Sequence, residues 1–478
     1  MIPLRTAEIA DIVGGSLHRV EPDVFVTGAA TVDSRSIQRG GLFVGVVGER
    51  VDGNDFAAAA VDAGAAVALT SREVDAPSII VDDPVQALGL IAAEVVRRLP
   101  ETTVVALTGS QGKTSTKDFV RQILEQHGTT VATEGNLNNE IGVPITVTQA
   151  DERTRYLVVE MGARHIGNIA YLCGIAPPAI GLVVNVGVAH IGEFGSKERI
   201  ARAKGELVEA LPAAGHAVLN ADDPLVSAMR ERTEATVRTF GESASADVRL
   251  SDVRTTADGE PEFVLEHGAE RDRVRLRMLG MHQAMNAAAA AAVALTVGVS
   301  FADVVGGLNA ATTASSARLE RHELANGVVL INDAYNANPD SMRSALTTLQ
   351  TVAASRGGRA IAVLGEMREL GSSADDEHRL LGAYAAEAGI DELVLVGDGA
   401  GSIADGWTGA PVRRTDDVDQ AVQAVEDLVG PGDVVLVKAS LTIGLQRVAR
   451  ELLDRARHTA PGPTTSGRPG VDERTSSR

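Results

Sequence analysis

Residues 108–118, TGSQGKTSTKD, carry the clearest chemical signal in the sequence. They follow the apolar run TTVVAL, so a buried strand runs into a glycine-bracketed turn and then into a helix. Gly109 and Gly112 allow backbone N–H groups to point inward, and the free amides at a helix start favour an anion. Lys113 adds a positive charge for outer phosphates, and Thr114 offers a hydroxyl group to Mg²⁺. This order of parts predicts a nucleotide-phosphate site.

The loop is shorter than the common phosphate-loop pattern G-x-x-x-x-G-K-[ST], which would need glycine at the position of Leu107. The shortened loop argues against an ordinary signalling GTPase. A glycine-containing turn with a solvated lysine is the simpler alternative, but it does not account for the order of strand, motif and helix. The pattern therefore leaves open what the nucleotide is used for.

Two further polar residues follow apolar runs. Glu160 ends RYLVVE, and His190 comes shortly after IGLVVNV. The carboxyl ends of parallel strands share the sheet edge at which open α/β sheets bind ligands, so we expect both residues near the phosphate loop, where they could bind a metal. Glu160 could instead be a loop carboxylate that faces water, and a lone histidine after a strand is more often structural than a ligand.

Lys204 lies in RIARAKGELVEALP, four residues after Ile200 and four before Val208, on the apolar stripe of a predicted helix. A lysine on an inward face needs a partner or a changed charge. Its stem could run along the apolar face towards water, or it could form a buried ion pair. The functional alternative is covalent, because an uncharged lysine amine takes up CO₂ to form a carbamate, which is an anionic oxygen ligand for Mg²⁺.

The later segments GMHQAMN, NDAYNANPDSM and VKAS hold another set of candidates. Their asparagines could hydrogen-bond an adenine edge, and Asp333 could hold a ribose hydroxyl. Arg318 and Lys438 could reach phosphate oxygens from a separate domain. For each residue alone, helix capping or a solvated surface position is the competing interpretation.

The elements that must position these residues fall into three blocks of alternating strands and helices, which predicts an α/β fold. Residues 1–100 predict a small N-terminal α/β domain. Residues 101–314 predict a central parallel-sheet domain with a more polar, β-rich excursion near residues 236–280. Residues 315–458 repeat the alternation, and residues 459–478, rich in Pro, Gly, Ser and Thr, predict a disordered tail.

Composition narrows the function classes. The formal net charge of −20 argues against sequence-independent nucleic-acid binding, which needs a basic face. The single cysteine, Cys173, excludes an intrachain disulfide and suits a reducing cytosol. No stretch approaches the roughly 20 apolar residues of a membrane span. We therefore expect a soluble cytoplasmic protein without a membrane span.

Taken together, these segments resemble the Mur ligases of peptidoglycan synthesis. The resemblance covers nearly the whole chain before the tail, in the family's order, through DSR with GGLFVGVVGERVDGNDF, TGSQGKTSTKD, EGNLNNEIGVP, VVEMGARHIGNI, VAHIGEFGS, ARAKGELVEALP, LNADDP, LGMHQAMNAAAA, NDAYNANPDSM, LGEMRELG and VKAS. NLNNEIGVP and AYNANPDSM are most similar to the members that add D-alanyl-D-alanine. The DNPR motif of the diaminopimelate-adding members is absent.

The resemblance implies three domains: an N-terminal domain for the UDP end of the substrate, a central P-loop ATPase domain and a C-terminal Rossmann-like ligase domain. It implies that ATP is held by Gly109, Ser110, Gln111, Gly112, Lys113, Thr114, Ser115, Asn286, Arg318 and Asp333. It implies two Mg²⁺ ions, one held by Thr114 and Glu160 and the other by Glu160, His190 and a carbamylated Lys204. With Lys113, the last three would be the catalytic residues.

For the UDP-N-acetylmuramoyl-tripeptide substrate, the residues expected to make contact are Ser34, Arg35, Asn138, Asn139, Asn336 and Lys438. The implied reaction is ATP-driven amide-bond formation. The tripeptide carboxylate attacks the γ-phosphate to give an acyl phosphate and ADP, and the amine of D-alanyl-D-alanine then displaces phosphate. Lys113 and the Mg²⁺ ions offset the phosphoryl charge, and domain closure about the linker near Arg318 excludes water. We expect a monomer.

Two positions depart from the family pattern. Gln283 stands where the family usually has asparagine, and Leu441 stands where it usually has arginine, which removes a cation from the C-terminal side of the substrate cleft. Three alternatives stay open: another Mur-type or folylpolyglutamate-like amino-acid ligase, a P-loop switch or transporter ATPase, and a non-catalytic scaffold that keeps the P-loop fold.

Overall fold

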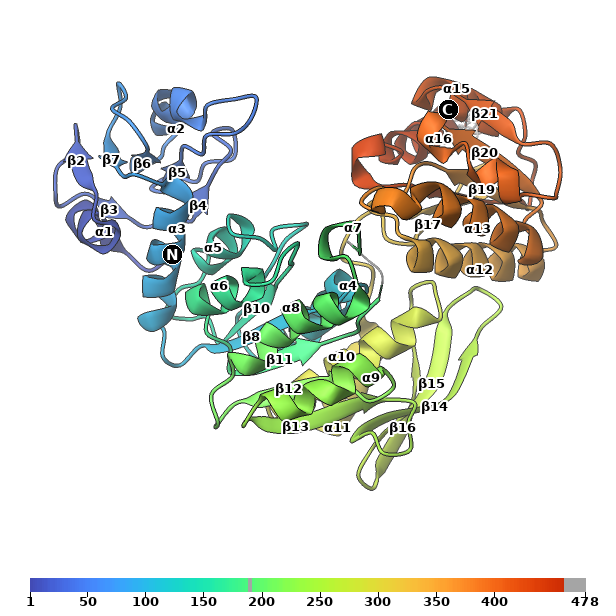
Figure 1. Ribbon diagram of the computed structural model, residues 1–478, viewed down its shortest axis with the longest axis horizontal. Coiled ribbons are helices and arrows are strands. Elements are labelled where there is room, and N and C mark those ends of the chain that lie inside the picture. The colour runs from blue at the N-terminus through green and yellow to red at the C-terminus, as the bar shows by residue number, and fades with distance from the viewer. Residues whose placement is uncertain (188–190, 460–478) are drawn as a thin grey trace, which may run out of the picture.

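The computed structural model describes residues 1–187 and 191–459 of the chain, and its strands form three large sheets with helices around them (Figure 1). An N-terminal lobe and a C-terminal lobe lie above a larger central lobe in this view. The predicted α/β class with three sheet-based units is therefore confirmed. The predicted metal ligand His190 and the predicted disordered tail beyond Thr459 lie outside the described residues.

The N-terminal lobe contains a five-stranded sheet whose strands are parallel except for β2. Its order is β2 (Ser16–His18), β7 (Ser78–Ile80), β6 (Val67–Thr70), β5 (Leu42–Val44) and β4 (Ala30–Thr31). The short strands β1 (Leu4–Arg5) and β3 (Phe25–Val26) pair separately. Helices α1 (Thr6–Val13), η1 (Gly53–Phe56) and α2 (Ala57–Asp62) surround the sheet.

The apolar run VFVTGAATV, residues 24–32, predicts one continuous strand from sequence alone. That prediction is wrong, because β3 and β4 belong to different sheets. The chain breaks at Gly28, where the N–H groups of Thr27 and Gly28 both donate to the carbonyl oxygen of Gly40 at 2.9 Å. A Cβ atom on Gly28 would lie 2.9 Å from the Gly41 backbone, so two chain segments approach too closely for a side chain.

Helix α3 (Pro84–Arg97) was absent from the sequence prediction and joins the N-terminal lobe to the central lobe. Asp83 caps it by accepting from the N–H groups of Val85 and Gln86, and proline occupies its first turn. The helix contacts α5 (Gly142–Val147) and α6 (Asn168–Ile175), so the apolar core runs continuously between these lobes.

The central lobe is built on a nine-stranded sheet. Its order is β16 (Glu270–Arg275), β15 (Pro261–His267), β14 (Val248–Thr255), β13 (Thr236–Gly241), β12 (His216–Asn220), β11 (Ile180–Val183), β8 (Thr103–Thr108), β10 (Tyr156–Glu160) and β9 (Thr130–Ala132). The strands from β9 to β14 are parallel, and β15 and β16 are antiparallel. The predicted β-rich excursion is the β13–β16 end of this sheet.

Helices cover both faces of the central sheet. One face carries α4 (Lys113–Leu124), α10 (His282–Thr296) and α11 (Phe301–Ala310) in a shared apolar cluster. A second apolar cluster holds residues of α5 and α6 together with α7 (Ile191–Phe194), α8 (Lys197–Glu209), α9 (Pro224–Ser227) and η2 (Ala228–Arg232). Helix α10 is rich in alanine, and its alanines from Ala287 to Ala292 are fully buried, so the small side chains let it pack closely on α4 and the sheet.

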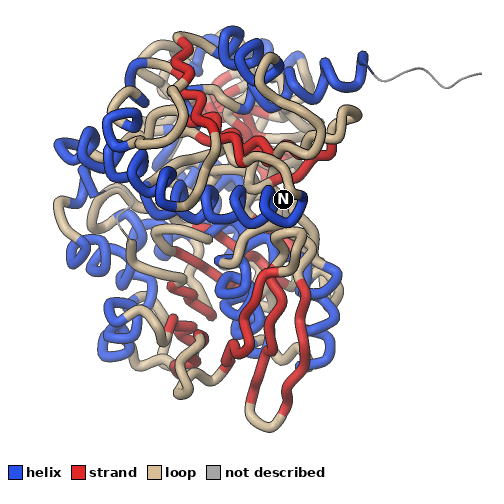
Figure 2. The backbone as a smooth tube through the Cα atoms, turned by 90° about the vertical axis from the view of Figure 1, so that its right-hand side faces the viewer, coloured by secondary structure: helices blue, strands red, loops and turns tan. Residues whose placement is uncertain are grey.

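The C-terminal lobe contains a six-stranded sheet, parallel except for β17. Its order is β17 (Glu320–Glu323), β18 (Val329–Asn332), β22 (Val434–Lys438), β19 (Ala360–Leu364), β20 (Glu392–Val396) and β21 (Arg413–Thr415). The helices are α12 (Pro339–Arg356), η3 (Gly371–Ser373), α13 (Ala374–Glu387), η4 (Asp398–Ala400), α14 (Ile403–Gly406), α15 (Val418–Glu426), η5 (Leu441–Ile443) and α16 (Gln446–Thr459). In Figure 2 they flank the strands of the upper lobe.

Close packing of the alanine-rich helix makes a stability prediction. Ala290→Leu should destabilise the fold by about 1–3 kcal/mol, because extra methylene groups have no room in a filled core. Chemical denaturation measures the change. Ala383→Leu, at an exposed helical position of α13, is the matched control and should stay within about 0.5 kcal/mol of the parent. Equal stability of the two variants would contradict the packing argument.

Candidate functional site

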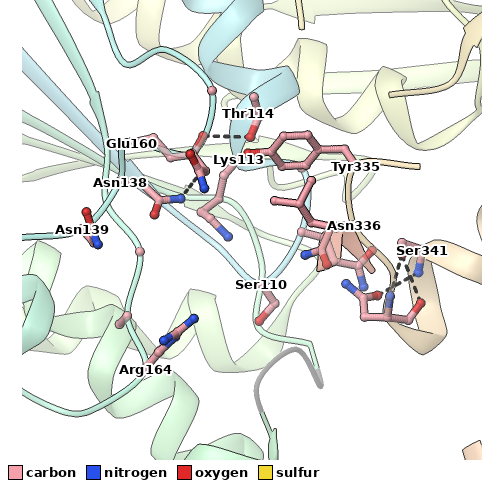
Figure 3. Close-up of a pocket in the computed structure, with 18 of the residues that line it drawn as sticks. Ser110, Lys113, Thr114, Asn138, Asn139, Glu160, Arg164, Tyr335, Asn336 and Ser341 are labelled. Atoms are coloured by element: carbon pink, nitrogen blue, oxygen red, sulfur yellow. Dashed lines mark hydrogen bonds between the residues drawn. The ribbon is translucent and has the colours of Figure 1, made fainter. Parts of the chain in front are cut away.

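A cavity of about 1410 Å³ is lined by residues of all three lobes. The residues labelled in Figure 3 are those of the central and C-terminal lobes. The N-terminal lobe supplies Asp83 and Gln86 at the start of α3. The central lobe supplies the phosphate loop, and the C-terminal lobe supplies residues near the start of α12. Gln111 of the phosphate loop donates to Asp340 of α12 at 2.9 Å, so the central and C-terminal lobes meet directly at this site.

The phosphate loop connects β8 to α4 at the carboxyl edge of the central sheet. Gly112 has φ of 74°, a left-handed conformation that glycine adopts without strain. A Cβ atom there would lie 2.2 Å from the Asn286 side chain, so glycine is required for space as well as for conformation. Residues 110–115 line the cavity, whereas Gly109 packs against Val184 below it.

Asn185 shapes the phosphate loop, and the sequence analysis missed it. Its Oδ1 atom accepts from the N–H groups of Ser110 at 3.0 Å and Gln111 at 2.9 Å. Its Nδ2 atom donates to the Gln111 carbonyl oxygen at 3.1 Å. Its position in the sequence could have identified it. Asn185 directly follows the apolar part of IGLVVNV, just as Glu160 ends an apolar run, and such residues lie at the ligand-binding edge of the sheet.

Lys113 begins α4, and its Nζ atom donates to the Gly109 carbonyl oxygen at 2.8 Å. Burial lowers the pKa of the Lys113 ammonium, the Glu160 carboxylate opposes this shift, and the positive charge of Arg318 adds to it. A cation in such a poorly solvated place is suited to an anionic ligand, because opposite charges attract more strongly when water is excluded.

Glu160 is a buried carboxylate, 2% exposed, at the end of β10 next to the phosphate-loop strand. Its Oε2 atom accepts from the Thr114 hydroxyl at 2.9 Å, and its Oε1 atom accepts from the Asn138 amide at 2.8 Å (Figure 3). The structure therefore brings together three of the predicted residues around one carboxylate group. Asn139 also lines the cavity, and its side chain accepts from the N–H of Gly142 at the start of α5.

Lys204 is buried on α8, 4% exposed, with Ile200, Leu207 and Val208 buried on the same helix. It lines the cavity with the phosphate loop. Burial lowers the pKa of its amine well below the usual value, the nearby Lys113 charge adds to this, and Glu160 opposes it. The environment thus makes the ammonium form of Lys204 less favourable than it is for a solvated lysine.

Asn286 and Gln283 form a pair at the start of α10. The Asn286 amide donates to Oε1 of Gln283 at 2.9 Å, and the Gln283 amide donates to the Ser115 hydroxyl at 3.4 Å. Gln283, which departs from the expected pattern, therefore links α10 to the phosphate-loop helix. The other departure, Leu441, is 41% exposed and lines the cavity on the wall that also carries Arg368.

Asp333 and Lys438 lie together at the carboxyl ends of β18 and β22. Lys438 is 2% exposed, and its Nζ atom lies 2.6 Å from Oδ2 of Asp333. It also donates to the Asn336 carbonyl oxygen at 2.9 Å. These three predicted residues line the cavity and contact one another, so much of the Lys438 charge is offset by Asp333.

Arg318 lies in the linker between the central and C-terminal lobes and lines the cavity. Its guanidinium group stacks over the Tyr335 ring, with 4.2 Å between the guanidinium carbon and the ring centroid. Ala317 and Leu319, on either side, have φ of 55° and 48°, which is uncommon for residues with side chains. The Arg318 side chain is therefore presented to the cavity by an unusual backbone shape.

Among the predicted site residues that the structure describes, Ser34 and Arg35 do not line the cavity, and neither does Gly109. Arg35 is 88% exposed and pairs with Asp33 at 2.9 Å, which holds the pKa of that carboxyl at about 2. Among the described residues no three His, Cys, Asp or Glu side chains cluster as a metal site. The same part of the chain contains no helix that is long and apolar enough to cross a membrane.

Three family models match the sequence: the Mur ligase family catalytic domain over residues 29–100, the Mur ligase middle domain over residues 107–294, and the Mur ligase glutamate ligase domain over residues 317–441. The chain belongs to the Mur ligase family. The three matches fall on the three lobes in chain order. The predicted family membership is confirmed.

Individual Mur ligases are similar over nearly the full chain. The UDP-N-acetylmuramoyl-tripeptide–D-alanyl-D-alanine ligase of Mycobacterium bovis is 43% identical, with 95% of this chain and 98% of the relative covered. The ligase of the same name from Escherichia coli is 36% identical, with 95% and 99% covered. Crystal structure I of MurF from Acinetobacter baumannii has a TM-score of 0.85 at 32% identity, covering 95% of this chain and 99% of that chain.

The MurF ligase of Thermotoga maritima, solved in complex with ADP, has a TM-score of 0.78 at 29% identity. That structure covers 91% of this chain and 99% of its own. Two more distant Mur ligases, including the MurC of the same organism with a TM-score of 0.58 at 19% identity, share the fold.

The glycine at position 112 generates a prediction. Gly112→Ala should abolish measurable ATP binding, because a Cβ atom would meet the Asn286 side chain and strain the left-handed turn. Isothermal titration with ATP and Mg²⁺ measures the affinity. Gly174→Ala is the control, since a Cβ atom at that exposed position of α6 meets nothing within 4 Å. Retained ATP affinity in Gly112→Ala would contradict the assignment of this turn to phosphate binding.

Proposed function

We propose that this protein is an ATP-dependent ligase that adds D-alanyl-D-alanine to UDP-N-acetylmuramoyl-tripeptide in peptidoglycan precursor synthesis. The observation that carries the proposal is the cavity shared by three lobes, with a phosphate loop on one wall. Relatives bearing that name, up to 43% identical over 95% of the chain, support it. The ADP complex of the Thermotoga maritima structure supports ATP as the nucleotide.

The division of labour follows the three predicted domains. Residues 1–100 bind the UDP end of the substrate, with Ser34 and Arg35 as contacts. Residues 101–314 bind ATP through the phosphate loop and Asn286. Residues 315–458 complete the site and receive the second substrate, supported by the cavity wall that this lobe provides. The enzyme acts as a monomer in the cytoplasm, where nucleotide-linked precursors and ATP are available.

Amide formation needs activation because a carboxylate oxygen is a poor leaving group. The substrate carboxylate attacks the γ-phosphorus of ATP, a P–O bond to ADP breaks, and an acyl phosphate forms. The uncharged amine of D-alanyl-D-alanine then attacks the acyl carbon. The C–O bond to phosphate breaks, inorganic phosphate leaves, and the amine nitrogen loses a proton. Lys113, at the edge of the phosphate loop, neutralises charge on the transferring phosphoryl group.

The oxygen atoms at this edge fit Mg²⁺, which in such sites uses one or two carboxylates together with substrate phosphates. Thr114 and Glu160 would hold one ion, because a hydroxyl and a carboxylate lie side by side there. Glu160, a carbamylated Lys204 and His190 would hold a second. Bound Mg²⁺ supplies charge neutralisation for the phosphoryl group. The low pKa of Lys204 supports the carbamate, because CO₂ reacts with an uncharged amine.

The substrate assignment has a direct test. With UDP-N-acetylmuramoyl-tripeptide, ATP and Mg²⁺, phosphate release should depend on D-alanyl-D-alanine, and mass spectrometry should find the pentapeptide product with one phosphate released per amide bond. Sustained phosphate release without an acyl acceptor would instead indicate a P-loop ATPase. A preference for a single amino acid would indicate another Mur-type or folylpolyglutamate-like ligase.

The carbamate has its own test. Lys204→Ala should lower kcat by roughly 10²–10³-fold, as for other lost transition-state electrostatic contacts, and short carboxylic acids such as formate should restore part of the activity. Lys197→Ala, at an exposed position of the same helix, should keep parental activity. The assay is phosphate release at saturating substrates. Full activity of Lys204→Ala, or an equal loss in Lys197→Ala, would reject the role.

A further inference from the structure

A buried ion pair on α4 lies outside the phosphate site described above. Lys117 and Asp118 are 2% and 7% exposed, and Nζ of Lys117 lies 2.6 Å from Oδ1 of Asp118. Removing two charges from water is costly unless each finds further hydrogen bonds. Both side chains have such partners. Those of Lys117 connect it to Glu160, and those of Asp118 connect it to the linker between the central and C-terminal lobes.

The lysine side of the pair leads to the buried carboxylate. Lys117 donates to the Thr133 carbonyl oxygen at 2.8 Å. The Thr133 hydroxyl in turn accepts from the N–H of Glu160 at 3.0 Å. Thr133 is fully buried and follows β9, the neighbour of β10. The ammonium group therefore holds the chain segment against which the Glu160 backbone is placed.

The aspartate side of the pair leads to the interlobe linker. Oδ2 of Asp118 accepts from the Ser315 hydroxyl at 2.6 Å. One turn further along α4, the Gln122 side chain makes two hydrogen bonds with the Thr312 backbone, each at 3.0 Å. The first half of the linker between α11 and β17 is thus fastened to the phosphate-loop helix.

The second half of the linker is fastened to the C-terminal lobe. The N–H of Leu319 donates to Asp333 at 3.1 Å, and the Ala317 carbonyl oxygen accepts from the N–H of Tyr335 at 3.2 Å. Between these attachments the chain adopts left-handed φ values at Ala317 and Leu319. Such conformations persist where surrounding contacts determine them. Arg318 lies between the two, and its charge acts on Lys113.

We propose that Lys117 and Asp118 are positioning residues for the phosphoryl-transfer site. Through Ser315 they hold the linker so that Arg318 faces the nucleotide phosphates, and through Thr133 they hold Glu160 at the same edge. The inference rests on the proposed function in one respect, namely that Arg318 contacts ATP. It makes Ser315, which does not line the cavity, important for nucleotide affinity and turnover.

The test removes only the hydrogen bond between Ser315 in the linker and Asp118 on α4. Ser315→Ala in the full-length protein should weaken ATP binding, measured by titration with Mg²⁺ present, and should lower kcat, each by roughly tenfold, the size expected for a lost hydrogen bond to a charged group. Affinity for the UDP-linked substrate, measured separately, should not change. Ser315→Thr keeps the hydroxyl group and should restore both quantities.

Ser300→Ala is the matched control, because Ser300 donates to Asp303 at the same 2.6 Å distance, at the start of α11. It should lower the melting temperature while ATP affinity and kcat stay at the parental values. Equal ATP affinities in Ser315→Ala and Ser300→Ala would overturn the inference. A parent protein that binds ATP but forms no D-alanyl-D-alanine product would refute the proposed function instead, and the ATP titration would still decide the role of Ser315.

Discussion

The site depends on one constraint, the burial of the Glu160 carboxylate near enough to Lys113 and Lys204 for its charge to act on both. Burial lowers the pKa values of Lys113 and Lys204, and the charge of Glu160 opposes both shifts without reversing them. If both lysines were charged, the single negative charge of Glu160 could balance only one of them, and the other would be a buried charge without a counter-ion. Two features reduce this imbalance. The pKa of Lys204 is lowered, and Lys113 lines the cavity, where an anionic ligand can bind next to it.

This balance explains why a polyanion is the natural ligand. A bound nucleotide would add negative charge next to Lys113 and Arg318, which line the same cavity, and a divalent cation would offset the repulsion between its phosphates and Glu160. The hydrogen bonds from Thr114 and Asn138 occupy both Glu160 oxygens, which orients the carboxylate before any ligand arrives. Preorganisation of this kind spares the cost of reorienting dipoles when the phosphoryl group moves.

Local sequence predicted the features that depend on neighbouring residues. The strand–turn–helix order located the phosphate loop, and the inward face of one helix identified the buried Lys204. Asn338 can cap a helix and Pro339 fits a first helical position, so the sequence predicts a helix start there, and α12 does begin at Pro339 with Asn338 as its cap. The break between β3 and β4 was missed, because it follows from contacts between Gly28 and a segment more than ten residues away. Asn185 was missed because its partners are 74 and 75 residues distant.

The residues of the C-terminal lobe illustrate the same limit at the level of function. Asp333 and Lys438 were predicted for separate ligand contacts, but the fold brings these residues, 105 positions apart in the chain, into one ion pair. Asp333 also accepts from the linker at Leu319, so this ion pair and the linker are parts of one structure. A movement of the C-terminal lobe relative to α4 must therefore displace Arg318, because the linker is attached at both ends and the arginine lies between the attachments. Any approach of the C-terminal lobe to the central lobe would therefore also change the distance between Arg318 and the phosphate loop.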